Sequence, residues 1–414
     1  MSEEKKIPVG WEETEIGNLV DLAQGLAINA KTNYVLSDKE NGIPLLKINN
    51  LLNNTIDQYA NPDLVPKQSI IHKDDVIFTR TGQVGAVLFN KYGILHNNSF
   101  KVIPKDEIYW KYLYWYLKSE RVYNYVQKVA AGSVQKDLNH SAFKTIEFKY
   151  PKNKGEQQSI ADILTTFDNK IELLHSQNRT LEETAQTIFA EWFGKYQIED
   201  ELPDDWRMFQ LSELVDTING YSYKGSELVE SSEEALVTLK SFDRNGGFQT
   251  RGFKPFIGKP KANQEVKIGD LIVAHTDLTQ DADVLGNPAF IFDDGGFKKM
   301  YMTMDLVKVV PISKDVSSSF LYYLMKDKAF KGHCVGYSNG TTVLHLSKKA
   351  IPEYQLLLPI DFNLIKRFSK IADSTTTKIS LNKLTIKSLA ETRDELLPRL
   401  MCGEVRVNEY KVKE

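Results

Sequence analysis

The stretch IPVGWEETEIGNLVDLAQG, from Ile7 to Gly25, returns later in the chain as LPDDWRMFQLSELVDTING, from Leu202 to Gly220. At a constant offset of 195 residues the two stretches share Pro8, Trp11, Leu19, Val20, Asp21 and Gly25 of the first copy. Self-similarity at a fixed period is the sequence signature of a repeated structural unit. The chain is therefore predicted to hold two copies of one unit of roughly 200 residues.

The similarity continues beyond these stretches, with small insertions. Leu46-Lys47 matches Leu239-Lys240, Asp75–Phe78 matches Asp270–Val273, Phe100–Pro104 matches Val307–Pro311, Leu113–Lys118 matches Leu321–Lys326, and Gly132 matches Gly340. Short apolar runs that end in polar loops are typical of strands, whereas LYWYLK and LYYLMK are predicted helices with aromatic residues in the core. Each unit is thus predicted to be an α+β domain.

A different pattern begins at Gln157, after the breaker segment PKNKG at 151–155. Apolar residues then recur at alternating steps of four and three, which predicts a long helix with a seam that packs on a partner helix. The seam is Ile160, Leu164, Phe167, Ile171, Leu174, Asn178, Leu181, Ala185, Ile188 and Trp192. An offset of 208 gives a more polar second seam: Phe368, Ala372, Thr375, Ile379, Asn382, Ile386, Leu389, Arg393, Leu396 and Leu400.

Geometry relates these two helices. If the first helix leads from one domain to the other, the second must run back, which predicts an antiparallel coiled coil with pseudo-two-fold symmetry. Pro398 is expected to end or kink the second helix near Leu397. The expected boundaries are 1–150 for the first domain, 151–195 for the first helix, 196–359 for the second domain, and 360–414 for the second helix and tail.

The bulk composition narrows the class of protein. The 414 residues carry a formal net charge of −3, which excludes an indiscriminately basic nucleic-acid binder, so any DNA-facing surface must be local. No window approaches the roughly 18 apolar residues that span a bilayer, and no targeting signal is visible at the N-terminus. We therefore expect a cytoplasmic protein.

In this order, the motifs resemble those of the specificity subunit of type I restriction–modification systems, over nearly all of residues 7–407. The carriers are the two Pro-x-x-Trp openings, the loop TRTGQVG at Thr79–Gly85, GSVQKDL at Gly132–Leu138, GEQQSIADIL at Gly155–Leu164, and ELLPRLMCGEVRV at Glu395–Val407. In the second copy HTDLTQDADVLGNP, from His275 to Pro288, replaces TRTGQVG, and Ile365-Lys366 replaces Gln157-Gln158. This departure weakens the transfer of residue roles to the second loop.

The resemblance implies a non-catalytic subunit with two target-recognition domains, each reading one half of an asymmetric split DNA site. It also implies that the helices act as a ruler and dock two copies of an adenine-N6 methylation subunit, with a restriction subunit as a further partner. S-adenosylmethionine, ATP and magnesium would then be bound by the partners, and this chain would bind no cofactor.

Candidate DNA contacts follow from the chemistry of base recognition. Arg and Lys pair with guanine, Asn and Gln pair with adenine, and polar groups hold phosphates. In the first domain the candidates are Lys47, Asn49, Asn50, Thr79, Arg80, Thr81, Gln83, Ser133, Gln135, Lys136 and Asn139. In the second they are Lys240, Arg244, Asn245, His275, Thr276, Tyr337, Ser338, Asn339, Thr341, Thr342 and His345. Surface turns and a structural histidine are the competing interpretations.

Two further classes stay open: a stand-alone DNA methyltransferase or nuclease of an unusual type, and a dimerising scaffold without DNA specificity. Asn287–Phe290 resembles the Asn-Pro-Pro-aromatic methyltransferase motif but has the wrong third residue, and we interpret it as a β-turn. Glu147–Lys149 has the local form of a nuclease motif without an identifiable partner acid. The seven histidines lack the spacing of metal ligands, so no metal site is predicted.

Overall fold

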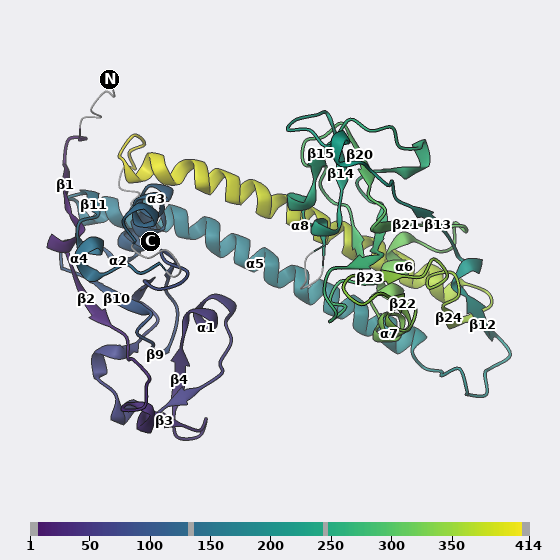
Figure 1. Cartoon of the computed structure of the whole chain (residues 1–414), viewed down its shortest axis with the longest axis horizontal. Helices are drawn as coiled ribbons and strands as arrows, with labels where there is room; N and C mark the ends of the chain where they lie inside the picture. Colours follow the sequence, from purple (N-terminus) through teal and green to yellow (C-terminus); the bar gives the residue numbers. More distant parts are fainter. Residues whose placement is uncertain (1–6, 131–135, 243–246, 408–414) are drawn as a thin grey trace, which may run out of the picture. The chain divides into compact units, whose positions relative to one another are not determined.

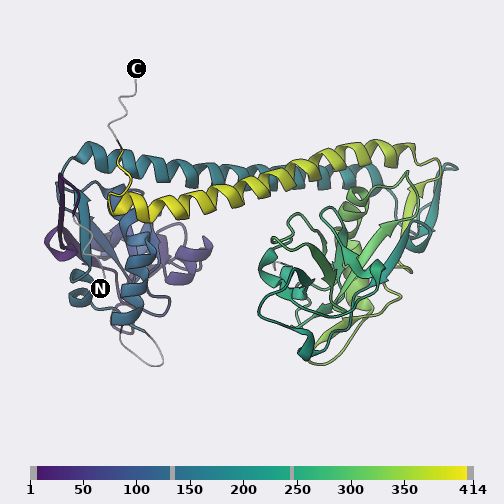
Figure 2. The same ribbon diagram turned by 90° about the horizontal axis from the view of Figure 1, so that it is seen from above.

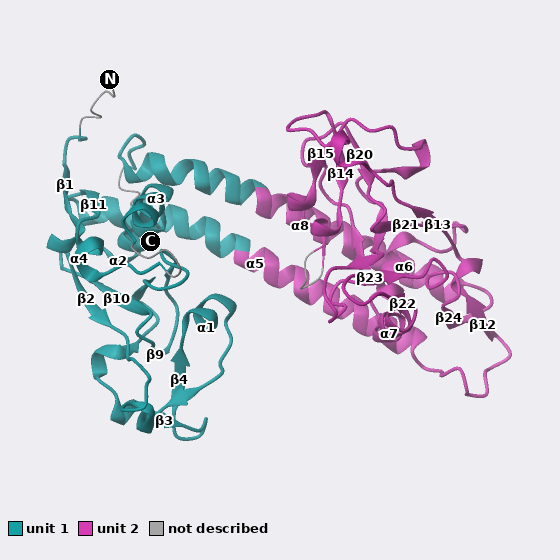
Figure 3. Ribbon diagram, in the orientation of Figure 1, with its two compact units in different colours: residues 1–171, 388–414 teal, residues 172–387 magenta. Residues whose placement is uncertain are grey.

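A computed structural model describes residues 7–130, 136–242 and 247–407 of the chain. It divides into two compact units, residues 1–171 with 388–414 and residues 172–387 (Figure 3). Both long helices, α5 (Lys154–Phe193) and α8 (Asn363–Met401), contribute one segment to each unit. In the described part of the chain, no helix is both long and apolar enough to cross a membrane.

The first unit is built from three sheets and several short helices (Figure 1). An antiparallel pair joins β1 (Trp11–Glu15) to β11 (Glu147–Pro151). A four-stranded sheet has the order β2 (Val20–Gln24), β10 (Ser99–Pro104), β7 (Val76–Thr79) and β8 (Val87–Leu88). A five-stranded sheet has the order β3 (Leu36–Ser37), β5 (Tyr59–Ala60), β4 (Ile43–Leu46), β9 (Gly93–Leu95) and β6 (Ile70–Ile71). The helices are α1 (Ile48–Asn53), α2 (Trp110–Lys118), α3 (Glu120–Val129) and α4 (His140–Lys144).

The second unit repeats the antiparallel pair and the first four-stranded sheet, and differs in its other sheets. Its antiparallel pair is β12 (Trp206–Gln210) with β24 (Gln355–Pro359). One four-stranded sheet has the order β13 (Val215–Asn219), β21 (Leu306–Pro311), β17 (Leu271–Ala274) and β19 (Pro288–Phe290). The other has the order β15 (Lys254–Pro255), β14 (Glu234–Val237), β20 (Lys299–Met302) and β16 (Glu265–Val266). A small sheet adds β18 (Thr276–Asp277), β23 (Leu344–Leu346) and β22 (Ser338–Asn339), and the helices are α6 (Ser318–Met325) and α7 (Lys328–Gly336).

The register of the strands gives an alignment of the two units that is independent of residue similarity. Phe100 pairs with Phe78 as Val307 pairs with Val273, in agreement with the sequence match. The match of Leu46-Lys47 to Leu239-Lys240 is wrong, however. Leu46 pairs with Leu95, and the strand position that pairs in the same way with Met302 is Val237. The shared Leu-Lys dipeptide shifts the sequence alignment by two residues, because the loops that follow the two strands have different lengths.

Each unit has its own antiparallel pair of helix segments, seen side by side in Figures 1 and 2. In the first unit Asp168 of α5 forms an ion pair with Arg393 of α8. In the second, Asn382 Nδ2 donates to Asn178 Oδ1 over 2.8 Å, and Phe189 packs edge-on against Phe368 at 5.4 Å between ring centroids. Every residue of both predicted seams is buried or half-buried. Phe189 and Phe193, one position further round α5, are buried as well.

Two predicted helix limits need correction. The helix α5 begins at Lys154, inside the expected breaker PKNKG, because the Asn153 side chain accepts the Gly155 N–H at 2.8 Å and caps the first turn. The helix α8 does not end near Leu397 but runs through Pro398 to Met401. Leu397, Leu400 and Met401 are buried in the core of the first unit, and this packing outweighs the hydrogen bond lost at the proline.

The core of each unit joins the sheets to its helix segments. In the first unit Tyr112, Leu113 and Trp115 of α2 are at most 1% exposed, so the aromatic run LYWYLK is core, as the sequence predicts. In the second unit Phe320 of α6 packs against Phe189 and Phe368. Both cores include residues of α5 and α8, so each domain folds onto its own segment of the long helices.

Candidate nucleic-acid interface

In the first unit, the loop that follows strand β7 holds Arg80 in a fixed orientation. Its Nη2 donates to Asp137 Oδ2 at 2.7 Å, its Nε to Asp137 Oδ1 at 3.1 Å, and its Nη1 to Gln24 Oε1 at 3.2 Å. Thr81 Oγ1 donates to the same carboxylate at 2.8 Å. The Arg80 guanidinium, chiefly through these hydrogen bonds, lowers the pKa of Asp137. The arginine side chain remains 23% exposed, so it is oriented and still accessible.

Backbone hydrogen bonds gather the candidate loops of this unit around Arg80. Its N–H donates to Asn98 O at 2.9 Å, and its own carbonyl accepts from Leu138 N at 2.9 Å. Gly82 N donates to Lys136 O at 3.1 Å. The segments that contain Arg80 and Lys136, predicted as separate candidate loops, are therefore neighbours.

The third candidate segment, at Lys47, lies one strand away. His96 N donates to Leu46 O at 3.1 Å, so the ends of the parallel strands β4 and β9 lie together and the chain leads from His96 to Asn98. Lys47 Nζ donates to Gln58 Oε1 at 2.7 Å. Burial, more than the nearby Lys47, lowers the pKa of His96. The loop that connects the candidate segments is thus 96–98.

Individual candidates of the first unit differ in accessibility. Asn49, Gln83 and Lys136 are exposed. Thr79 is fully buried and donates to Gln83 O, and Asn50 is 2% exposed and donates to Asp57 Oδ2 at 2.8 Å. Neither side chain is therefore accessible to DNA. Asn139 is exposed, but its Oδ1 caps helix α4. Ser133 and Gln135 lie outside the described residues.

The second unit builds the same backbone frame with different side chains. His275 N donates to Asp305 O at 2.7 Å, and Leu346 N donates to His275 O at 2.9 Å. The same two backbone hydrogen bonds join Arg80 to Asn98 and Leu138 in the first unit. His275 and His345 therefore occupy the places of Arg80 and Asp137. Thr276 Oγ1 lies 3.3 Å from His345 Nδ1. Burial lowers the pKa of His275 and so favours its neutral form.

The remaining candidates of the second unit surround this frame. The exposed ones are Lys240, Asn339, Thr341, Thr342 and His345. Tyr337 and Ser338 are half-buried and donate to Glu353 Oε2 and Val335 O. Like Thr79, His275 and Thr276 are buried, at 9% and 4% exposure, and serve the frame more than the surface. Arg244 and Asn245 lie outside the described residues.

The loop that replaces TRTGQVG in the second unit is held from both sides. The Asp277 carboxylate, 3% exposed, accepts from Thr279 N and Oγ1, Val284 N and Leu285 N. From helix α7, the Lys331 ammonium donates to four oxygens: Ala282 O at 2.7 Å, Asp283 O at 3.2 Å, Leu285 O at 2.6 Å and Asn287 Oδ1 at 2.9 Å. Hydrogen bonds to the Asp277 carboxylate and from the Lys331 ammonium thus hold this long acidic loop.

Sequence reasoning missed four residues beside these frames. Gln24 holds Arg80, and Asn98 supplies the carbonyl that accepts the Arg80 N–H. Gln249 and Arg251 lie beside Lys240 in the lining of one groove of the second unit. Gln24 could have been found from the sequence, because it immediately precedes Gly25, which recurs in the repeat. The other three stand in irregular loops, where no periodicity marks them.

The structure also bears on the two enzymatic motifs. Asn287–Phe290 is not a β-turn, because Pro288–Phe290 is strand β19, paired with β17. A proline is tolerated there because β19 is an edge strand. Glu147 and Lys149 of β11 form ion pairs with Arg121 and Glu13. Within the described ranges, no group of three or more His, Cys, Asp or Glu could hold a metal ion.

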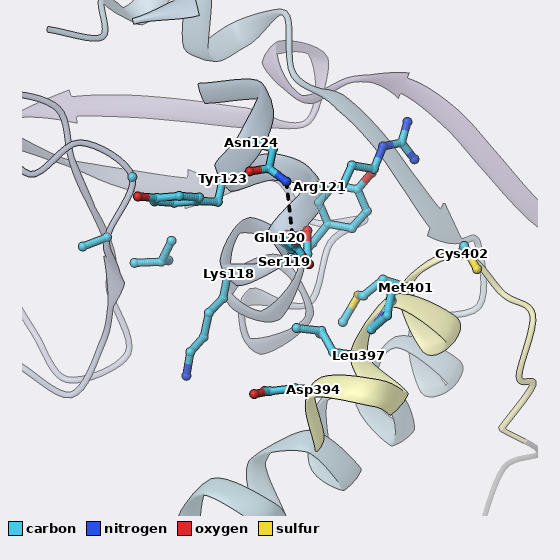
Figure 4. A pocket seen from close by; sticks show the side chains of 15 residues that line it. Lys118, Ser119, Glu120, Arg121, Tyr123, Asn124, Asp394, Leu397, Met401 and Cys402 are labelled. Atoms are coloured by element: carbon cyan, nitrogen blue, oxygen red, sulfur yellow. Dashed lines mark hydrogen bonds between the residues drawn. The ribbon is translucent and has the colours of Figure 1, made fainter. Parts of the chain in front are cut away.

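A cavity of about 690 Å³ lies in the first unit between helix α3 and the end of α8 (Figure 4). Its apolar wall includes Tyr123, Leu397 and Met401. The cations on its rim are already paired, since Lys118 forms an ion pair with Asp168 and Arg121 one with Glu147. The cavity therefore has none of the unpaired positive charge that a phosphate site requires.

Comparison with known proteins identifies relatives of one kind. Residues 8–183 match the family model of the type I restriction modification DNA specificity domain. The MjaIX specificity subunit of a type I restriction enzyme from Methanocaldococcus jannaschii is 24% identical over 363 residues, 82% of this chain and 79% of that protein. The MjaVIII specificity subunit from the same organism is 23% identical and covers 97% of this chain and 94% of its own length.

A solved structure has the same fold. It is the S subunit of a type I restriction-modification system from M. genitalium, and it superposes with a TM-score of 0.61 at 18% identity, over 97% of this chain and 98% of that one. At this level of identity the likeness concerns the fold alone.

Proposed function

Because residues 8–183 match the family model of the type I restriction modification DNA specificity domain and relatives aligned over most of the chain are specificity subunits, we propose that this chain is such a subunit and reads an asymmetric bipartite DNA site, one half with each unit. One observation supports the asymmetry: equivalent backbone frames hold Arg80 with Asp137 in one unit and His275 with His345 in the other, and the accessible side chain is Arg80 in the first and His345 in the second. Similar frames dock on DNA in similar ways, and different side chains select different bases. The recognition domains would be residues 1–150 and 196–359.

In this proposal the two long helices, within 151–195 and 360–414, form a coiled-coil ruler between the half-sites. The helix α5 has 40 residues, which at about 1.5 Å per residue is roughly 60 Å. At about 3.4 Å per base pair, a spacer of this length would correspond to at most roughly 18 base pairs between the half-sites. The buried pair of Asn178 and Asn382 would fix the register of the helices.

The chain itself would recognise DNA without performing chemistry. Its partners would be double-stranded DNA, two copies of an adenine-N6 methylation subunit and, where the system encodes one, a restriction subunit. S-adenosylmethionine, ATP and magnesium would belong to those partners. The curated relatives carry the name of specificity subunits, which supports this division of labour.

Co-expression tests the proposal. The purified chain should neither transfer methyl groups nor cut DNA, whereas its complex with a methylation subunit should methylate adenine in a split sequence. Methylome sequencing with and without the gene should identify that sequence. Methylation or cleavage by the chain alone would instead favour the unusual methyltransferase or nuclease.

The ruler has a separate test. Insertion of about one helical turn near Asn178 should change the gap between the half-sites and leave both half-site sequences unaltered. Altered half-sites at an unchanged gap would contradict the ruler.

A further inference from the structure

A groove of about 680 Å³ crosses the surface of the second unit. One wall contains Leu239, Lys240, Phe242, Gln249 and Arg251, and the other contains Asp277, Leu278, Thr279, Asp283 and Val284. The second wall is the loop that replaces TRTGQVG. The groove therefore lies between two polar loops of one unit, beside a candidate segment that the sequence identifies only by Lys240.

The first wall is a rigid platform of two 3₁₀ turns, η7 (Leu239–Ser241) and η8 (Thr250–Gly252). Thr238 Oγ1 donates to Gly252 O at 2.8 Å, and Gln249 N donates to Ser241 O at 2.9 Å. A Cβ atom at position 252 would lie 2.3 Å from Ser241 N, so only glycine permits this close packing. Lys240 and Arg251, each the central residue of its turn, are thereby held on neighbouring turns.

The wall formed by the two 3₁₀ turns carries exposed positive charge. Lys240 and Arg251 are exposed, and neither forms an ion pair with any residue that the structure describes. Across the groove, the Asp277 carboxylate is buried and accepts four hydrogen bonds from its own loop. Asp283 is the exposed acid among the described lining residues. Exposed cations without an ion-pair partner among the described residues are available to the phosphates of a polyanion.

The groove also carries the side chains that recognise base edges. Gln249 Nε2 donates to Lys240 O at 3.0 Å, which orients the amide; within the described residues its second N–H and its Oε1 have no hydrogen-bond partner. An oriented glutamine amide forms a bidentate pair with adenine, and an arginine fork forms one with guanine. The opposite wall is tied to helix α7 by the hydrogen bonds from Lys331 to Ala282 O and Leu285 O.

We propose that this groove binds the DNA half-site read by the second unit, with Gln249 and Arg251 as specificity-determining side chains and Lys240 as a phosphate contact. The inference rests on the proposed function and adds two residues to it that no sequence motif marks. The duplex presents its base edges to Gln249 and Arg251 while its backbone follows Lys240.

Selection of bound duplexes from a randomised DNA library, with the full chain in complex with its methylation subunit, tests the assignment. For Gln249→Ala and Arg251→Ala we expect a loss of discrimination of about 5- to 150-fold at one or two positions of one half-site, with the other half-site unchanged. Arg251→Lys keeps the charge and should retain affinity while losing discrimination. Lys240→Ala should weaken binding to all duplexes alike and reduce the salt dependence by about one released ion.

Lys314→Ala is the matched control, since Lys314 is an exposed cation of the same unit outside the groove. It should leave the selected sequence unchanged. If the wild-type complex selects a split site and the groove variants select the same one, the groove assignment is wrong while the proposed function stands. If the wild-type complex selects no sequence, the proposed function itself fails.

Discussion

The Lys331 contacts give the sharpest quantitative prediction, which concerns the Lys331→Met substitution. Methionine preserves most of the length of the side chain and removes the ammonium that binds Ala282 O, Asp283 O, Leu285 O and Asn287 Oδ1. We expect the loop at 278–287 to open locally while the rest of the second unit stays folded, because these contacts join only the loop and helix α7.

The magnitude follows from the donors available. An ammonium has three hydrogens, so at most three of the four contacts are fully made at once. Hydrogen bonds to charged groups contribute about 1.5–3 kcal/mol each. Desolvation lowers the pKa of Lys331, which shows that burial of the charge offsets part of this gain. We therefore expect a net local destabilisation of about 2–4 kcal/mol, below the sum of the contacts.

Hydrogen exchange of the loop amides measures this change directly. A local destabilisation of about 2–4 kcal/mol accelerates exchange through local opening by roughly 30- to 900-fold. Lys328→Met is the matched control, because Lys328 is exposed on the same helix. Equal exchange rates for residues 278–287 in the two variants would refute the clamp, and uniform acceleration across the second unit would show that Lys331 supports the whole core instead.

Four further predictions concern three other contacts. Arg80→Ala should relax or weaken recognition of the first half-site alone, by about 1–3 kcal/mol in a binding assay, and loss at both half-sites would contradict its assigned place. Because Arg80 lowers the pKa of the Asp137 carboxyl, the pair stabilises the fold at pH values above the ordinary carboxyl pKa. This stability is lost as the pH falls through the lowered pKa. Urea titrations between pH 7 and pH 2 should show the loss in the wild type and not in Arg80→Ala. Asn382→Leu should lower the free energy of unfolding by about 1–3 kcal/mol, because it leaves Asn178 buried without its partner, and the double Leu variant should recover most of it; a double variant as unstable as the single one would show that the amide pair contributes nothing specific. Arg406→Met should cost about 1–3 kcal/mol in urea denaturation, since it removes a two-point ion pair with the buried Glu156, and an unchanged midpoint would show that the ion pair adds no stability.

The internal match of the two halves predicts much of the fold. Strand registers agree at Phe100 and Val307, and the heptad spacing locates both long helices. The errors occur where local rules compete with packing. At Asn153 a side-chain cap starts the helix early, and at Pro398 a buried apolar face carries the helix past its expected end.

The candidate interface is less accessible to sequence reasoning. Arg80 stands out as an arginine between glycine-permitted turns, but its partner Asp137 is 57 residues away. The similarity of LK at Lys47 and Lys240 suggests an equivalence that the strand register overturns by two residues. Whether a polar residue supports the frame or faces solvent depends on burial, which separates Thr79 from Gln83 although they are four residues apart.

The repeat, the α+β character of the units and the two helical seams can be inferred from the amino-acid sequence, because hydrophobic periodicity and turn residues are local properties that both copies of the unit share. Which loops meet, which cations are paired and which stay exposed become visible only in the folded chain. Those properties depend on contacts between residues far apart in the chain. Arg80 and His275 make the point: the same backbone frame holds both, and only the folded chain reveals that one is oriented by a carboxylate and the other is buried.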